Sequence, residues 1–300
     1  MTAILLLGKN GQVGWELQRS LAPLGTVMAP GRQGADGLCG DLADLDGLAA
    51  TVRAMRPAVI VNAAAYTNVD KAEAEPDLTR RINAQAPAAL AREAAACGAL
   101  LVHYSTDYVF DGSGDKPWTE DAPTGPLNVY GRTKLEGEQA IRASGCAHLI
   151  LRTSWVYAAR GGNFARTMLR LGQQRERLTV VGDQWGAPTG AELIADVTAH
   201  AIRQLRQRPQ DAGTYHLAAQ GAASWFEYAN TIFEYVRQAR HDIALAVKEV
   251  APIPASAYPA PARRPHNSLL DTSRLQSVFG VHLPDWTDGV RRMLTETAIS

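Results

Sequence analysis

A short apolar run at the start of the chain leads directly into a glycine-rich turn. Ala3–Gly8 is a predicted strand, and Gly8, Gly11 and Gly14 follow the spacing G-x-x-G-x-x-G at the start of a predicted helix over Gln12–Leu24. Glycines at these positions allow a tight turn and let the backbone approach a pyrophosphate, which binds at the positive end of a helix. The turn therefore predicts a dinucleotide site. A strand-to-helix turn without a ligand is the alternative.

Strands and helices alternate through the first half of the chain. The strands are nearly all apolar, as is typical when both faces are covered, and the intervening helices suit right-handed crossovers. The further predicted strands are Thr26–Ala29, Ala58–Asn62, Ala99–Ser105 and His148–Thr153, and the predicted helices are Leu45–Met55, Leu78–Cys97 and one that carries Tyr130. The sequence predicts an α/β fold with a Rossmann-type doubly wound parallel sheet in a domain over residues 1–156.

The pattern is looser in the second half of the chain. The predicted elements are one strand, Thr214–Ala218, and the helices Asn163–Gln174, Ala191–Arg206, Ser224–Arg240 and Asp285–Glu296. The stretch Pro252–Pro265 has too many prolines for a helix or a central strand, and we interpret it as an ordered loop over a site. We expect residues 157–300 to form a smaller, mainly substrate-binding domain of mixed α/β structure. Whether some of its segments return to the first sheet is left open.

Charge and cysteine content exclude several classes of protein. The 300 residues include 30 basic and 30 acidic side chains, and this balance argues against non-specific binding to nucleic acid or to a membrane surface. Cys39, Cys97 and Cys146 are far apart, so neither a disulfide framework nor a zinc site is indicated. The first residues do not resemble a signal peptide, and no apolar run reaches membrane-spanning length. We expect a cytoplasmic protein.

The predicted second strand is followed by a cation where NAD-binding folds commonly have an acid. An Asp or Glu at this point holds the ribose 2′-hydroxyl, but the stretch Met28–Arg32 contains no acid. We therefore expect Arg32 to face a 2′-phosphate and the protein to prefer NADPH, with use of NADH left open. Asp41 and Leu42 are expected near the adenine. The small residues of Ala63–Tyr66 would let a cofactor lie against the backbone, although ordinary strand packing is an alternative for that run.

Tyr130 and Lys134 are one helical turn apart and therefore share a helix face. The usual pKa of a tyrosine is about 10, and a nearby cation in a dry cleft can lower it by stabilising the phenolate. Alone, the pair is a weak signal, because many solvated helices carry it. Thr106, at the end of a predicted strand, adds a hydroxyl that could reach the same carbonyl oxygen. A plain strand-end cap is the alternative for Thr106.

The glycine loop, the strand-end hydroxyl and the Tyr-x-x-x-Lys pair together resemble the extended short-chain dehydrogenase/reductase superfamily. Within it, the chain is similar to the branch that reduces dTDP-linked 4-keto-6-deoxysugars. The resemblance covers essentially the whole chain and is carried by the runs Gly8–Leu17, Val69–Glu73, Tyr104–Phe110, Arg152–Tyr157, Gly186–Gly190 and Pro261–Ser268. It implies NADPH-dependent reduction of the C4 ketone of dTDP-4-dehydro-6-deoxy-L-mannose to dTDP-L-rhamnose, a precursor of surface polysaccharides such as the lipopolysaccharide O-antigen.

The resemblance also implies roles for individual residues. Tyr130 would act as general acid, Lys134 would lower its pKa and hold the nicotinamide ribose, and Thr106 would bind the substrate oxygen. The expected cofactor-binding residues are Gly8, Asn10, Gly11, Gln12, Val13, Gly14, Arg32, Asp41, Leu42, Ala63, Ala64, Ala65, Tyr66, Tyr130 and Lys134. The expected substrate-binding residues are Val69, Thr106, Asp107, Tyr108, Trp155, Arg263 and Arg264. From the residues alone, Trp155 is equally well a core aromatic, and the two arginines equally well belong to a solvated loop.

A homodimer with a metal ion is a further implication of the resemblance. Some members bind Mg²⁺ through glutamates at a dimer interface, and the matching positions are Glu16, Glu192 and Glu296. Carboxylate ligands suit this hard cation. Each of the three is also explained as a solvated helix residue, so the metal is left open.

Two other functions remain open from the sequence. A sugar-nucleotide epimerase or dehydratase of the same fold would keep NAD⁺ bound and need no external reductant. A non-catalytic relative would bind NADP and regulate a partner enzyme. The presence of Thr106, Tyr130 and Lys134 argues against this last alternative.

Overall fold

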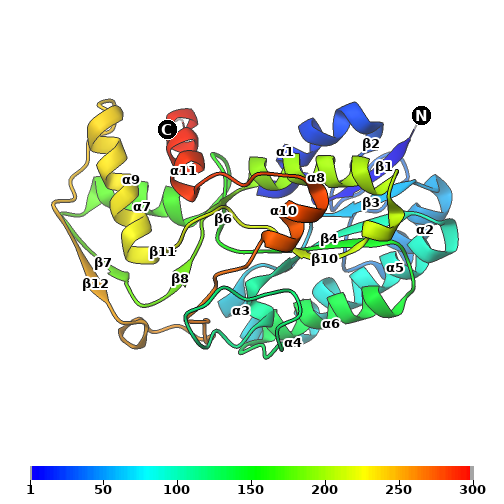
Figure 1. Cartoon of the computed structure of the whole chain (residues 1–300), viewed down its shortest axis with the longest axis horizontal. Coiled ribbons are helices and arrows are strands. Elements are labelled where there is room, and N and C mark those ends of the chain that lie inside the picture. Colours follow the sequence, from blue (N-terminus) through cyan, green and yellow to red (C-terminus); the bar gives the residue numbers. More distant parts are fainter. Residues whose placement is uncertain (1, 298–300) are drawn as a thin grey trace.

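The computed structural model describes residues 2–297, and its largest element is a six-stranded parallel sheet (Figure 1). The strand order β10-β5-β4-β3-β1-β2 places the first strand between the second and the third, as in a doubly wound fold. The strands are β1 (Ala3–Leu7), β2 (Thr26–Met28), β3 (Val59–Asn62), β4 (Leu100–Thr106), β5 (His148–Thr153) and β10 (Gly213–His216). All five neighbouring pairs are parallel.

Helices cover both faces of this sheet because its strands are apolar on both sides. In β1, Ile4 and Leu6 pack towards α1 (Gln12–Leu21) and α8 (Ala191–Leu205), with α10 (Ser273–Phe279) on the same side. Leu5 and Leu7 pack towards α2 (Leu45–Met55), α5 (Ala86–Cys97) and α6 (Val129–Ala143) on the opposite side (Figure 1). Burying one such side chain contributes about 1.5–3 kcal/mol. The predicted fold class is confirmed.

One edge of the sheet comes from the second half of the chain. β10 pairs with β5, with Gly213 opposite Leu149 and His216 opposite Arg152. The strand predicted at Thr214–Ala218 therefore exists, but it begins at Gly213 and ends at His216. The second half thus completes the sheet as well as covering it with α8 and α10.

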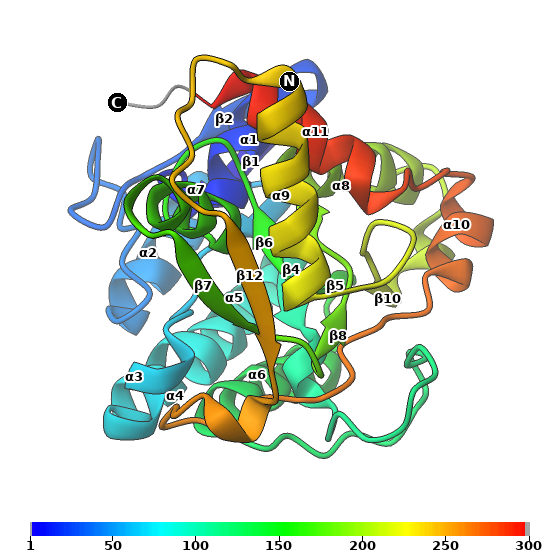
Figure 2. The same cartoon turned by 90° about the vertical axis from the view of Figure 1, so that its left-hand side faces the viewer.

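The remaining segments form a smaller unit with its own apolar core, at the front of Figure 2. It contains α7 (Phe164–Gln174), α9 (Trp225–Ala239), α11 (Trp286–Glu296) and a parallel pair of β7 (Arg177–Val181) with β12 (Glu249–Ile253). Two further short strand pairs occur outside these two sheets. β6 (Val156–Tyr157) pairs with β9 (Thr189–Gly190), and β8 (Trp185–Gly186) pairs with β11 (Ala223–Ser224).

Prolines account for three differences from the sequence-based elements. The predicted helix Leu78–Cys97 is wrong as one helix, because α4 (Pro76–Arg80), a π-helical turn (Arg81–Gln85) and α5 follow one another there. Pro87 has no N–H to donate to the carbonyl four residues earlier, and an inserted π turn accommodates such a gap.

The other two differences also lie beside prolines. The helix predicted to reach Leu24 ends at Leu21, and a 3₁₀ turn containing Pro23 follows. The start of the Pro252–Pro265 stretch is wrong as a loop, because Pro252 lies in β12, an edge strand whose missing N–H costs little. The structure also contains a helix that the sequence does not predict, α3 (Val69–Ala74), which comes directly before α4 in the chain.

Candidate active site

The glycine loop joins β1 to α1 and leaves the start of that helix open to a ligand. Gly8 has φ +89°, and Gly11 N donates to Gly8 O at 2.9 Å. A Cβ on Gly14 would lie 2.0 Å from Gly8 O, so only glycine fits this turn. The N-cap residue of α1 is Gly11, and no side chain accepts a hydrogen bond from the first N–H groups of this helix. These N–H groups are therefore suited to bind an anion.

The backbone after β3 runs against this loop. A Cβ on Gly8 would lie 2.7 Å from the carbonyl carbon of Ala63 and from the nitrogen of Ala64. The half-buried run Ala63–Tyr66 therefore begins next to the glycine loop, and its role in binding a cofactor stays a prediction. Asn83, in the π turn, accepts from Tyr66 N at 2.8 Å and donates to Tyr66 O at 3.0 Å, which fixes the end of this run.

The loop after β2 forms a cavity of about 600 Å³ whose lining includes Arg32 and Asp41. Arg32 is exposed and can turn towards a phosphate at this place. Leu42 differs from the expectation, because its side chain is 5% exposed and packs in the core against α2 and α5. Only its backbone is available to a cofactor.

Asn128 begins the helix that carries the predicted acid. Its side chain accepts from Gly131 N at 2.8 Å and donates to Arg263 O at 2.7 Å. Tyr130 follows in the first turn of α6, and Thr106 ends β4 opposite it. Thr106 donates to Asp107 Oδ1 at 3.0 Å and accepts from Tyr108 N at 3.2 Å. A hydroxyl and a phenol thus meet at the carboxyl end of the sheet.

Burial dominates the acidity of these groups. It raises the pKa of Tyr130 to about 12, against an opposing hydrogen bond with Thr106. Lys134 Nζ donates to Tyr104 O at 2.5 Å and lies 3.1 Å from His103 Nε2, and the effect of Lys134 on the pKa of Tyr130 stays a prediction. Burial also lowers the pKa of Lys134 to about 8, and Glu138 opposes this. A phenol with a raised pKa stays protonated at neutral pH, as a proton donor must be.

Aromatic and charged side chains extend the site from Tyr130 towards α3. The Tyr108 ring stands edge-on to Tyr130, with centroids 5.6 Å apart. Arg264 donates to Asp70 Oδ2 at 2.7 Å, next to Val69 at the start of α3. Arg263 is exposed, and its carbonyl accepts from Asn128. The loop that contains both arginines is therefore fastened beside Tyr108 and the start of α6.

Trp155 lies in an aromatic cluster of the smaller unit. Its backbone has φ +48°, a strained value for a residue with a side chain, and its ring stacks on Trp225 with centroids 3.5 Å apart. A Cβ on Gly186 would lie 2.6 Å from Trp155 Cε2, so glycine is required at this position against the ring. Both readings offered by the sequence fit this half-buried position, a core aromatic and a platform for a ligand.

Comparison with known proteins fits this arrangement of residues. The family model described as "RmlD substrate binding domain" matches residues 1–299. The dTDP-4-dehydrorhamnose reductase of Escherichia coli (strain K12) is 56% identical over 98% of this chain and 97% of its own length. The chain belongs to the dTDP-4-dehydrorhamnose reductase family.

Solved structures of this family have the same fold. A dTDP-4-dehydrorhamnose reductase from Clostridium acetobutylicum is 34% identical and superposes with a TM-score of 0.87 over 98% of this chain and 99% of its own. The enzyme from Bacillus anthracis, in complex with NADP, is 35% identical with a TM-score of 0.87 over 99% of this chain and 100% of its own. Like its relatives, the chain is an NAD(P)H-dependent oxidoreductase.

The glutamates predicted from dTDP-4-dehydrorhamnose reductases to bind a metal line one cavity of about 290 Å³. Glu16 and Glu296 are each paired with an arginine, Arg19 at 3.7 Å and Arg292 at 3.1 Å. Burial raises the pKa of Glu192, and the other two glutamates add to the effect. Within residues 2–297, no three His, Cys, Asp or Glu side chains are placed to hold a metal ion.

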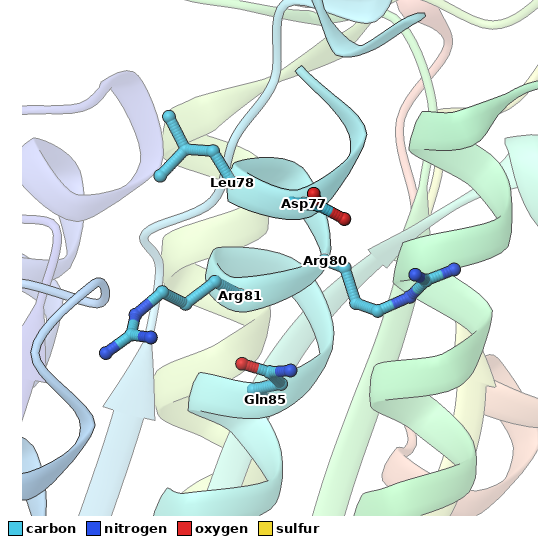
Figure 3. Close-up of a pocket in the computed structure, with 5 residues that line it drawn as sticks. All are labelled: Asp77, Leu78, Arg80, Arg81 and Gln85. Carbon is cyan, nitrogen blue, oxygen red and sulfur yellow. The ribbon is translucent and has the colours of Figure 1, made fainter.

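A hollow of about 380 Å³ over α4 and the π turn contains none of the residues expected from the family (Figure 3). Arg80 and Arg81 extend from it in opposite directions (Figure 3). Arg80 bonds Glu136 at 2.9 Å, and Arg81 donates to Ala43 O at 2.5 Å. Arg80 thus joins α4 to α6, Arg81 joins the π turn to the turn before α2, and we assign the hollow no function. Across the described part of the chain, no helix is long and apolar enough to cross a membrane.

Several residues whose hydrogen bonds hold the site in place were not predicted as functional from the sequence. They are Asn62, Asn83, His103, Asn128, Glu138 and Arg152. Asn62, His103 and Arg152 are polar residues inside apolar strands, and Asn128 precedes a helix, which is a common capping signal. For Asn83 and Glu138, in helices, the sequence offers no such signal.

Proposed function

We propose that this chain catalyses the NADPH-dependent reduction of the C4 ketone of dTDP-4-dehydro-6-deoxy-L-mannose to dTDP-L-rhamnose. The observation that supports it most directly is that Tyr130 and Thr106 meet at the same carboxyl edge of the sheet as the uncapped glycine loop, in a chain 56% identical to a named reductase. The open start of α1 suits the pyrophosphate of a dinucleotide. Bound NADPH supplies a hydride to C4 of the sugar.

The residues of the chain supply the remaining steps. Thr106 would hydrogen-bond the ketone oxygen and stabilise the charge that forms on it. Tyr130, protonated because burial raises its pKa, would give its proton to that oxygen as general acid. Lys134 would hold the nicotinamide ribose and restore the proton of Tyr130. Arg264, in exchange for Asp70, would bind the substrate diphosphate, for which a guanidinium is suited.

A reconstituted reaction tests this function. Purified protein, NADPH and enzymatically prepared 4-keto sugar nucleotide should give dTDP-L-rhamnose with one NADPH oxidised per product. An epimerase or dehydratase would instead convert its substrate without external reductant. Absence of both reactions, together with intact NADP binding, would favour a regulatory subunit.

We propose in addition a homodimer whose interface includes Glu16, Glu192 and Glu296, with Mg²⁺ bound only when both chains contribute. The shared cavity and the raised pKa of Glu192 support this, because a carboxylate cluster gains from a cation. If EDTA changes neither the molecular mass measured in solution nor the activity, the metal part is wrong. A cytoplasmic location remains a prediction.

A further inference from the structure

His103 is a fully buried polar residue in the apolar strand β4, and none of the steps above uses it. Asn62 of β3 lies opposite it in the sheet, and Asn62 Nδ2 is 3.2 Å from His103 Nδ1. On the other side of the ring, His103 Nε2 is 3.1 Å from Lys134 Nζ. The imidazole therefore connects a strand amide to the lysine of the proposed active site.

The amide of Asn62 determines which nitrogen of His103 carries the proton. Asn62 Oδ1 accepts from Ala64 N at 3.3 Å, so its NH₂ group faces the imidazole. Burial holds the pKa of His103 well below its usual range, so the ring is neutral. A neutral imidazole has one donor and one acceptor. Because the NH₂ group only donates, Nδ1 is the acceptor and the proton is on Nε2.

The Nε2 proton then points at Lys134. An ammonium group has only donors, so it cannot accept this proton. An uncharged amine can accept from Nε2 with its lone pair while donating one hydrogen to Tyr104 O, 2.5 Å away. Both contacts of Lys134 are therefore satisfied together only by the uncharged form.

We propose that Asn62 and His103 form a hydrogen-bonded pair that positions the Lys134 amine and favours its uncharged form. His103 is thus a positioning residue, which acts on the reaction through Lys134. Glu138, one turn along α6, favours the charged form in opposition. These opposed influences let Lys134 release and regain a proton near neutral pH, and this last consequence alone rests on the proposed function.

The tautomer of His103 can be measured without any activity assay. In protein labelled with ¹⁵N-histidine, long-range ¹H–¹⁵N spectra distinguish the two neutral forms, and His103→Gln assigns the signal among seven histidines. We expect the Nε2–H form in the native protein. In Asn62→Asp, the carboxylate should draw the proton to Nδ1 and reverse the tautomer. An Nδ1–H form in the native protein would overturn the proposal.

The titration of Lys134 gives a second, independent measurement. The chain has five lysines, and ¹³Cε-lysine spectra over pH, assigned with Lys134→Arg, follow this one. In His103→Gln, the amide oxygen can accept from an ammonium, so the pKa of Lys134 should rise by about one unit, which is about 1.4 kcal/mol. In Asn62→Asp it should also rise.

Matched controls separate this effect from general damage. His148→Gln makes the same change at the start of β5, away from Lys134, and should leave the Lys134 titration unchanged. An unaltered Lys134 pKa in both His103→Gln and Asn62→Asp would contradict the proposal, and if one variant does not fold, the other decides. If the native protein lacks reductase activity while its Lys134 responds as described, the proposed function fails and the present inference stands.

Discussion

Glu138 and Arg152 form a two-pronged ion pair inside the protein, with Nε–Oε1 at 2.9 Å and Nη2–Oε2 at 2.7 Å. The Glu138 side chain is fully buried and that of Arg152 is 3% exposed. The pair ties α6, which carries Tyr130 and Lys134, to β5, the strand next to the edge strand β10. The pair therefore helps to fix the position of Tyr130, the proposed general acid, relative to the carboxyl ends of the strands.

Glu138→Gln should destabilise the protein by about 3 kcal/mol, because it leaves a buried arginine unpaired. Thermal unfolding should show a clear decrease in Tm. Glu136→Gln, which breaks an exposed pair with Arg80, is the control and should cost less than about 1 kcal/mol. Equal effects of the two substitutions would contradict the assigned importance of the buried pair.

The same pair predicts a loss of stability in acid. Burial alone would raise the pKa of Glu138, but the hydrogen bonds from Arg152 hold it below its usual value. Its contribution is therefore present above the unfolded pKa of about 4.3 and is lost as pH falls through the folded pKa. The free energy of unfolding of the native protein should fall below pH 4 more steeply than that of Glu138→Gln.

The burial of Asp107 leads us to expect that stability also depends on pH with the opposite sign, falling as pH rises. Burial raises its pKa to about 7, so its contribution is present below the unfolded pKa of about 3.9 and is lost as pH rises through 7. In Asp107→Asn, the stability gained relative to the native protein should increase between about pH 4 and pH 7, by up to about 1.4 kcal/mol per pH unit, and level off above pH 7. The exposed Asp115→Asn is the control, and a pH-independent difference for Asp107→Asn would show that Asp107 does not titrate as described.

Tyr130→Phe should reduce kcat by roughly 10²–10⁴-fold, because it removes the proposed general acid. The affinity for NADPH, measured by fluorescence titration, should change little. Tyr235→Phe on α9 is a matched control outside the site and should keep full turnover. Native turnover in Tyr130→Phe would refute the assignment.

Gly14→Ala should weaken both folding and NADPH binding. The added Cβ would lie 2.0 Å from Gly8 O, so the turn must open, at a cost of about 1–3 kcal/mol. Gly162→Ala is the control, since nothing lies within 4 Å of its added Cβ. Melting temperature and NADPH titration of the two variants would measure the difference, and tight NADPH binding by Gly14→Ala would argue against a pyrophosphate at this turn.

Arg32→Ala should raise the KM for NADPH about tenfold or more and leave that for NADH nearly unchanged. The physical reason is the loss of a guanidinium facing the 2′-phosphate, the one group that distinguishes the two cofactors. Gln33→Ala changes the same exposed loop without changing its charge and serves as control. A parallel rise of both KM values would mean that Arg32 does not read the 2′-phosphate.

The sheet was predictable because the apolar strands and the glycine turn are local signals. The division of the helical region into α4, the π turn and α5 was less predictable. Good helix formers such as residues 84–96 favour one continuous helix, and the sequence has no local signal for a π turn. Pro252 misled in the other direction, because its tolerance depends on β12 lying at an edge.

The composition of the site was more predictable than its contacts. Tyr130, Lys134 and Thr106 carry a recognisable spacing, but the partners of Lys134 are not visible in it. His103 and Tyr104 contact Lys134 because α6 packs against β4, and these residues are about 30 positions apart in the sequence. Arg264 likewise meets Asp70 across 194 residues, which neither periodicity nor local motifs could reveal.

The return of β10 to the edge of the sheet limits how proteins of this kind can be recombined. A single crossover near residue 156 would transplant an edge strand and the helices α8 and α10 together with the smaller unit. A chimera of two relatives would then have to match foreign side chains along the whole contact of α8 with α1. Because Tyr108 and Trp155 are predicted to line the sugar pocket, we expect new sugar specificity to be reached more easily by substitutions in the loops around them than by exchange of halves.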